Sequence, residues 1–136
     1  MAQTHTNALE QIIMEHLLNG VQPTAITPHL GLMTAATDIP AGTVTEVTGG
    51  SYARVALAAL FPESPSDGTA AANNADIEFP QATASWGTIT HMGIWSASTE
   101  GTLLAVITLD DSRAIDTDDI FRVLTGQLTL NLTAPA

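Results

Sequence analysis

The sequence predicts a mainly β protein: an antiparallel β-sandwich of jelly-roll type with one N-terminal α-helix. After residue 20, short apolar segments alternate with Pro, Gly and Thr, which is typical of strands and turns. In QLTLNL (127–132) leucines alternate with polar residues, as in a half-buried antiparallel strand. A chain of 136 residues fits one domain. We therefore expect residues 1–20 to form a helical arm and residues 21–136 to form the sandwich.

The helix is predicted from its ends and its spacing. Asn7 followed by Glu10 has the form of an N-cap with its reciprocal partner, and Asn19-Gly20 can end the helix. A single apolar stripe recurs at helical intervals and must be buried against the sandwich or a neighbouring subunit. The stripe consists of Leu9, Ile12, Ile13, His16 and Leu17.

The remaining elements are predicted from apolar segments bounded by turn residues. The segment 52–61 is ambiguous because its four alanines suit a helix equally well. Residues 62–74 are rich in Pro, Ser, Asn and Gly and predict an exposed loop that could contact a partner. Strands are expected at 28–34, 43–48, 52–61, 75–79, 82–86, 88–95, 102–109, 120–124 and 127–132.

Composition and charge exclude several classes of function. The net charge is −11, with three arginines and no lysine, so direct nucleic-acid binding is disfavoured. Only 12% of residues are charged, and a weakly charged surface favours association with other protein. Without cysteine there is no disulfide, thiolate metal site or cysteine nucleophile. The N-terminus has no secretory-signal pattern and no apolar run approaches the ~20 residues of a membrane span, so no membrane contact is expected.

Motifs that carry chemistry are weak. Gly49-Gly50-Ser51-Tyr52-Ala53 lacks the last glycine of a serine nucleophile elbow and is better explained as a hairpin turn. The four histidines do not show metal-ligand spacing, and His91 fits a hydrogen-bonded residue at the edge of a core. The aspartates at 110–119 do not match an EF-hand loop, which leaves a bound Ca²⁺ as a minority interpretation. No catalytic, metal or cofactor-binding residue is assigned, and no cofactor is expected.

Tryptophan and glycine are concentrated in IEFPQATASWGTITHMGIW (77–95), where Trp86-Gly87 predicts a bulge or strand bend. This string, with EVTGGSYARVAL (46–57) and TLLAVITLDDSRAIDTDDIFRV (102–123), resembles a family of small tailed-bacteriophage virion proteins. Its members include head decoration, minor tail and tail-fibre-like proteins. The resemblance covers roughly residues 7–132 and brings no catalytic residues with it. It also favours a strand over a helix at 52–61.

The resemblance implies a non-enzymatic structural subunit of the virion. The first hypothesis is a capsid decoration (cement) protein, a trimer on the outer head surface that clamps the major capsid protein and stabilises the shell. A tail or tail-fibre component is the alternative. A third hypothesis, of another class, is a carbohydrate-binding or hydrolytic β-sandwich in which Trp86, Trp95, Tyr52 and His91 line a sugar platform.

Contact residues are expected on the helix and in the long loop. Arg54 and Arg122 are rare cations and should form ion pairs with the many carboxylates. The candidate interface residues are Leu9, Ile12, Ile13, Leu17, Arg54, Glu63, Ser64, Asp67, Asn73 and Arg122.

Overall fold

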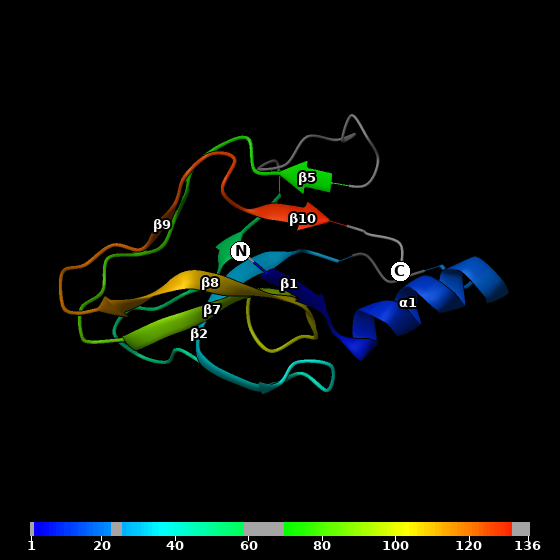
Figure 1. Ribbon diagram of the computed structural model, residues 1–136, viewed down its shortest axis with the longest axis horizontal. Helices are drawn as coiled ribbons and strands as arrows, with labels where there is room; N and C mark the ends of the chain where they lie inside the picture. The colour runs from blue at the N-terminus through cyan, green and yellow to red at the C-terminus, as the bar shows by residue number, and fades with distance from the viewer. Residues whose placement is uncertain (1, 23–25, 59–69, 132–136) are drawn as a thin grey trace.

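A computed structural model describes residues 2–22, 26–58 and 70–131, and its centre is one antiparallel sheet of six strands (Figure 1). The strand order is β1-β8-β7-β2-β3, and the short strand β4 also pairs with β2. One helix, α1 (Asn7–Asn19), follows β1. The mainly β, antiparallel architecture with an N-terminal helix is confirmed. The sheet contains β1 (Ala2–His5), β2 (His29–Asp38), β3 (Thr43–Glu46), β4 (Val55–Ala56), β7 (Gly87–Trp95) and β8 (Leu103–Ile115).

Two small ribbons accompany this sheet. One pairs β5 (Ala70–Ala72) with β10 (Thr129–Asn131), and the other pairs β6 (Ile77–Glu78) with β9 (Arg122–Val123). The β6–β9 ribbon covers one face of the sheet and encloses the main core, because its buried side chains share one cluster with those of the central strands. That cluster includes Leu30, Leu32, Ile77, Phe79, Ile89, Met92, Ile94, Ile107, Phe121 and Val123.

The opposite face of the sheet holds a smaller core around Trp95, with Met33, Leu103 and Val106. Gly31 and Gly93 are cross-strand partners in β2 and β7. A Cβ added at Gly31 would lie 2.6 Å from Cζ3 of Trp95, and one added at Gly93 would lie 2.7 Å from the same atom. The indole therefore packs directly on the backbone of two central strands, which explains why glycine interrupts both of them.

Several predicted boundaries need correction. Residues 82–86 are not a strand, because their N–H groups bond to three separate partners: Ala82 to Asp119, Thr83 to Gly50 and Trp86 to Ile115. The strand expected at 102–109 continues to Ile115, since β7 pairs with its second half. Strand β1 was not predicted, so the arm expected at 1–20 is not purely helical. Strand β5 falls inside the loop expected at 62–74.

The helix lies where it was predicted, but it begins one residue earlier because a different residue caps its N-terminus. Thr6, not Asn7, is the N-cap, and its side chain accepts a hydrogen bond from the Leu9 N–H. Gly20 ends the helix with a φ of 65°, as its sequence position indicated. Among the described residues, no helix has the length and apolar character needed to cross a lipid bilayer.

Candidate assembly surfaces

Helix α1 is anchored at its first residues and projects from one end of the molecule (Figure 1). The Thr6 side chain is buried, and its hydroxyl donates to the Leu103 carbonyl oxygen at 2.7 Å. The Thr6 N–H donates to the Leu104 carbonyl oxygen at 3.0 Å. These bonds join the start of the helix to β8. At the other end, the Gly20 N–H donates to the carbonyl oxygens of Glu15 and His16.

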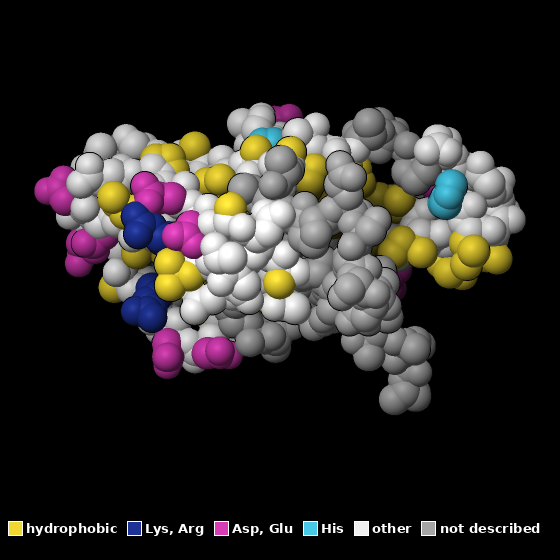
Figure 2. Space-filling model, turned by 90° about the horizontal axis from the view of Figure 1, so that it is seen from above, with side chains coloured by type: hydrophobic (Ala, Val, Ile, Leu, Met, Phe, Trp, Pro, Cys, Tyr) yellow, Lys and Arg dark blue, Asp and Glu magenta, His cyan; other side chains and the backbone are white. Residues whose placement is uncertain are grey.

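Beyond this anchor none of the helix residues is fully buried in the described structure. The predicted contact residues Leu9 and Ile12 are partly exposed, whereas Ile13 and Leu17 are 44% and 72% exposed. Met14 and Leu18 are also exposed, and we call Ile13, Met14, Leu17 and Leu18 the helix patch. Figure 2 shows apolar side chains at this end of the molecule.

The helix patch extends beyond the predicted stripe. Met14 and Leu18 follow Ile13 and Leu17 by one residue each, so the signal was present in the sequence. At 3.6 residues per turn the four side chains span an arc of about 140°. A helix of 13 residues is marginally stable in water without tertiary packing, so burial of this face would stabilise it.

Arg54, expected at an interface, is instead part of an internal network. Its Nε and Nη2 each donate to the Glu46 carboxylate at 2.7 Å, and its Nη1 donates to the carbonyl oxygens of Ala97 and Glu100. The guanidinium carbon lies 4.2 Å from the centroid of the Trp95 ring. Because the side chain is only 7% exposed, this arginine closes the second core.

Tyr52 completes the network by filling a gap in the sheet. Strands β4 and β3 pair with different parts of β2, and between them the Leu32 N–H donates to the Tyr52 hydroxyl at 2.8 Å. The same hydroxyl donates to Glu46 at 2.7 Å. Burial raises the pKa of Tyr52, and the Glu46 carboxylate raises it further, so the hydroxyl keeps the proton that it donates.

The two tryptophans do not form a sugar platform. Trp86 and Trp95 are 4% and 5% exposed, so neither ring is open for stacking. The indole N–H of Trp86 donates to the Gly50 carbonyl oxygen at 2.9 Å, and Tyr52 packs edge-on against its ring. His91 Nδ1 lies 2.7 Å from the hydroxyl of Thr90.

The contact residues predicted in the long loop differ in where the structure places them. Asn73 was expected to face a partner, but it is 2% exposed: its amide donates to the carbonyl oxygens of Ala75 and Leu124 and accepts from the Leu128 N–H. It therefore joins the two sides of the β5–β10 region instead of facing solvent. Glu63, Ser64 and Asp67 lie outside the described residues.

The turn and acidic motifs have structural roles. Gly49, Gly50 and Ser51 all have positive φ and form a turn, closed by the Tyr52 N–H, which donates to the Gly49 carbonyl oxygen. It is not the expected hairpin turn, because β3 and β4 on either side of it both pair with β2 and not with each other. Asp119 accepts a bond from the Asp116 N–H within its own turn. No group of three or more His, Cys, Asp or Glu side chains in the described ranges could hold a metal ion.

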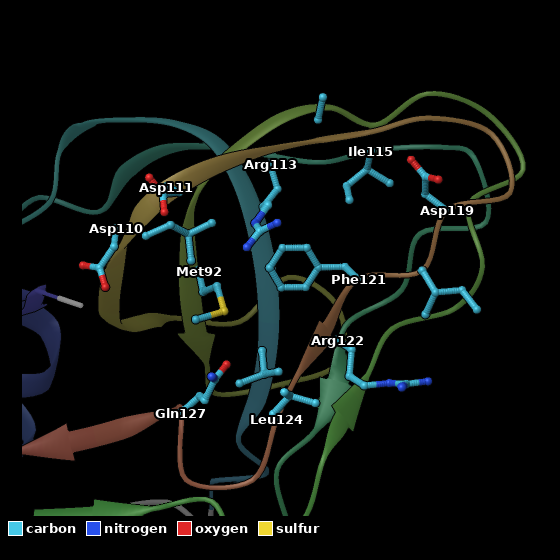
Figure 3. A pocket seen from close by; sticks show the side chains of 14 residues that line it. Met92, Asp110, Asp111, Arg113, Ile115, Asp119, Phe121, Arg122, Leu124 and Gln127 are labelled. Atoms are coloured by element: carbon cyan, nitrogen blue, oxygen red, sulfur yellow. The ribbon is translucent and has the colours of Figure 1, made fainter.

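A second surface feature is a groove of about 800 Å³ between β8 and β9, shown in Figure 3. Arg122, the remaining predicted contact residue, lies on it and pairs with Glu78 through Nε at 2.9 Å, so the expected ion pairs of Arg54 and Arg122 both form. Arg113, Ile120 and Leu124 also line the groove and were not predicted, because only the fold brings their strands together.

Comparison with known proteins identifies the family. No curated protein matches the chain. The model of one family, described as Podophage GP4 fiber I protein gp80, matches residues 4–131. The match includes α1, both cores and the groove, and it confirms the resemblance to phage virion structural proteins. The chain belongs to the podophage GP4 fiber I protein gp80 family, and it is a structural component of a phage virion.

Proposed function

We propose that the protein is a non-enzymatic fibre subunit that associates with further copies of itself, as a trimer, through the helix patch. The family match to a fiber protein carries this proposal. It favours the tail or tail-fibre alternative over capsid decoration, which the sequence placed first. The partners are therefore other copies of this chain and neighbouring tail proteins.

The helix patch supports association between identical copies. In a symmetric oligomer each copy supplies the same patch, so one axis near the helices covers all of the patches at once. In a dimer each helix meets one neighbour, whereas in a trimer it meets two, and a broad apolar arc suits two neighbours better. Glu10 is the only charged side chain in this arc and lies in the first turn of the helix.

The distribution of charge supports the same contact. Asp116, Asp118 and Asp119 lie in the turn between β8 and β9, at the end of the molecule opposite α1 (Figure 1). Charges separated by more than about 10 Å are largely screened at physiological salt. Copies joined through α1 therefore keep these carboxylates apart, despite the net charge of −11.

Location in the virion is tested by labelling. Gold-labelled antibody against the folded protein should mark the tail or its fibres in electron micrographs of intact particles, and quantitative gels should give at most a few dozen copies per particle. Labelling spread over the head, with hundreds of copies, would reject the fibre assignment and favour capsid decoration.

Association through α1 is tested by substitution. Leu17→Ser with Leu18→Ser should convert the trimer to monomer when mass is measured by light scattering after size exclusion. Leu124→Ser is the matched control, because Leu124 is also an exposed leucine but lies in the groove. Deleting residues 1–20 is a poorer test, since it also removes β1 and the Thr6 anchor. A wild-type monomer, or a doubly substituted trimer, would contradict the proposed contact.

A further inference from the structure

The groove is formed by an interruption in the pairing of β7 with β8. These strands pair up to His91–Thr108 and resume at Ile89–Arg113, so the single residue Thr90 faces the four residues 109–112. An insertion of this kind bends a strand away from its sheet. Strand β1 reaches only Thr108, where the insertion begins. The bent part of β8 stands apart from β9, and the groove lies between them.

Apolar side chains line much of this groove. Ile120 and Leu124 are 46% and 48% exposed, and Leu109 is partly exposed. Beneath them lie the buried side chains of Met92 and Phe121 (Figure 3). Exposed apolar residues beside a concave surface are typical of a site where another chain packs.

Arg113 gives the groove a positive charge that can select an acidic ligand. The other two arginines of the chain pair with Glu46 and Glu78, but among the described residues Arg113 has no ion pair or hydrogen bond of its side chain. Figure 3 shows the Arg113 side chain extending into the groove toward Phe121. An arginine fork beside an apolar surface is suited to one carboxylate, which it can bind through two parallel hydrogen bonds.

The acidic residues around the groove restrict the ligand further. Asp111 lies on the inserted segment, and Asp119 lies on the opposite wall (Figure 3). A ligand with several negative charges would be repelled by these carboxylates. A single acidic side chain between apolar neighbours can place its charge on Arg113 and its apolar groups against Ile120 and Leu124.

The backbone of β8 favours an extended ligand. Within the described chain, no strand pairs with β8 beyond Thr108 on the side that β1 occupies. An open strand edge next to a groove can accept a further strand through main-chain hydrogen bonds, while side-chain pockets select the sequence.

We propose that this groove binds an extended segment of a partner protein, with one acidic side chain on Arg113 and apolar side chains on either side. This site lies at the opposite end of the molecule from α1, so it goes beyond the proposed self-association (Figure 1). Loss of the α1 contact would leave it unchanged.

The test uses the small number of arginines in the chain. Three Nε–H signals are expected in a nitrogen–proton NMR spectrum of the full protein, and Arg→Gln variants assign them. The probes are the peptide acetyl-VTVEVTV-amide, its analogue with Gln in place of Glu, and oligogalacturonate. The Glu peptide should shift the Arg113 signal saturably and should bind about tenfold more tightly than the Gln peptide.

Two variants make the result specific. Arg113→Gln should weaken binding of the Glu peptide about tenfold, whereas Arg122→Gln, which changes a paired arginine on the same groove, should alter it by less than about twofold. Preserved amide spectra show that each variant is folded. The proposal is overturned if the Glu peptide gives no saturable shift, if the Gln peptide binds equally well, or if both variants weaken binding equally. Oligogalacturonate binding as tightly as the Glu peptide would overturn it in favour of a sugar acid.

Discussion

Trp95 and Leu17 are both large apolar side chains, but the chain encloses the first and leaves the second in water. Trp95 is 5% exposed, between the backbone of two glycines and the guanidinium of Arg54. Leu17 is 72% exposed, on a helix whose ends are capped but whose residues are not buried. The comparison shows that the second core of the β body is closed by its own side chains, whereas α1 satisfies the hydrogen bonds at its two ends but leaves its apolar face exposed. The apolar face of α1 can be buried when the protein packs against another molecule.

The largest expected difference between the two regions is in stability. Phe79 is 2% exposed and packs against the rings of Tyr52 and Phe121. Phe79→Ala should lower the free energy of unfolding by about 3–5 kcal/mol, because it leaves a cavity in the main core. Leu17→Ala should lower it by about 0.5 kcal/mol or less. Urea denaturation of both variants, at dilutions where the protein is monomeric, measures this contrast, and equal losses would contradict it.

The second core can be tested by filling the space beneath Trp95. Gly93→Ala should cost about 1–3 kcal/mol, because the new methyl group would meet the indole and displace it. Adding Trp95→Leu should make the Gly93→Ala change less costly, since it removes the nearest of the three side chains that the methyl group would meet. Leu103 and Met33, each 2.9 Å from the added carbon, still set a residual cost. A double-mutant cycle by chemical denaturation gives the coupling. Additive effects would mean that the indole does not limit the space at Gly93.

The ion pairs of Arg54 and Arg122 compare an enclosed part of the β body with its surface. Arg54 and Glu46 are 7% and 24% exposed, so Arg54→Gln leaves a largely enclosed carboxylate with the Tyr52 hydroxyl but without its cation, and should cost about 2–3 kcal/mol. Arg122 and Glu78 are about half exposed, and Arg122→Gln should cost about 0–1 kcal/mol. Thermal or urea unfolding compares the variants. A larger loss of stability for Arg122→Gln than for Arg54→Gln would contradict the expectation that the enclosed ion pair contributes more.

The smallest effect is expected at Asp76, on the exposed side of the β6 region. The N–H and hydroxyl of Thr125 donate to this carboxylate and lower the pKa of Asp76 below its usual value. The ionised form therefore stabilises the folded state above the ordinary Asp pKa of about 3.9, and this contribution is lost as pH falls through the lowered pKa. Asp76→Asn should flatten the acid side of a plot of stability against pH. An unchanged acid limb would show that these bonds add no stability.

Much of the body could be predicted because its signals are local. Ile77 and Phe79 alternate with Asp76 and Glu78 in the strand predicted at 75–79, and the structure buries the first two and exposes the other two. Glycines predicted the turn at 49–51 and the end of α1. Segments without such a pattern were missed: AQTH becomes β1 only because β8 offers an edge, and 82–86 connects three distant segments instead of pairing with one strand.

The site residues divide in the same way. Helical spacing was enough to place Ile13 and Leu17 on an apolar face, but not to show that the face stays exposed. Asn73 and Arg54 have internal partners that come from distant parts of the chain, and no local pattern encodes those contacts. Arg113 enters the groove because β8 gains residues opposite Thr90, which is a property of strand pairing.

Local sequence was enough to establish the β class, the helix and its C-terminal end, the turn glycines and the acidic surface, since each depends on the conformational and solvation preferences of neighbouring residues. The assembled fold is what encloses Arg54, leaves Arg113 without a side-chain partner among the described residues, separates β8 from β7 and exposes the apolar face of α1. Those outcomes depend on contacts between residues far apart in the chain, which form only when the whole sheet is assembled.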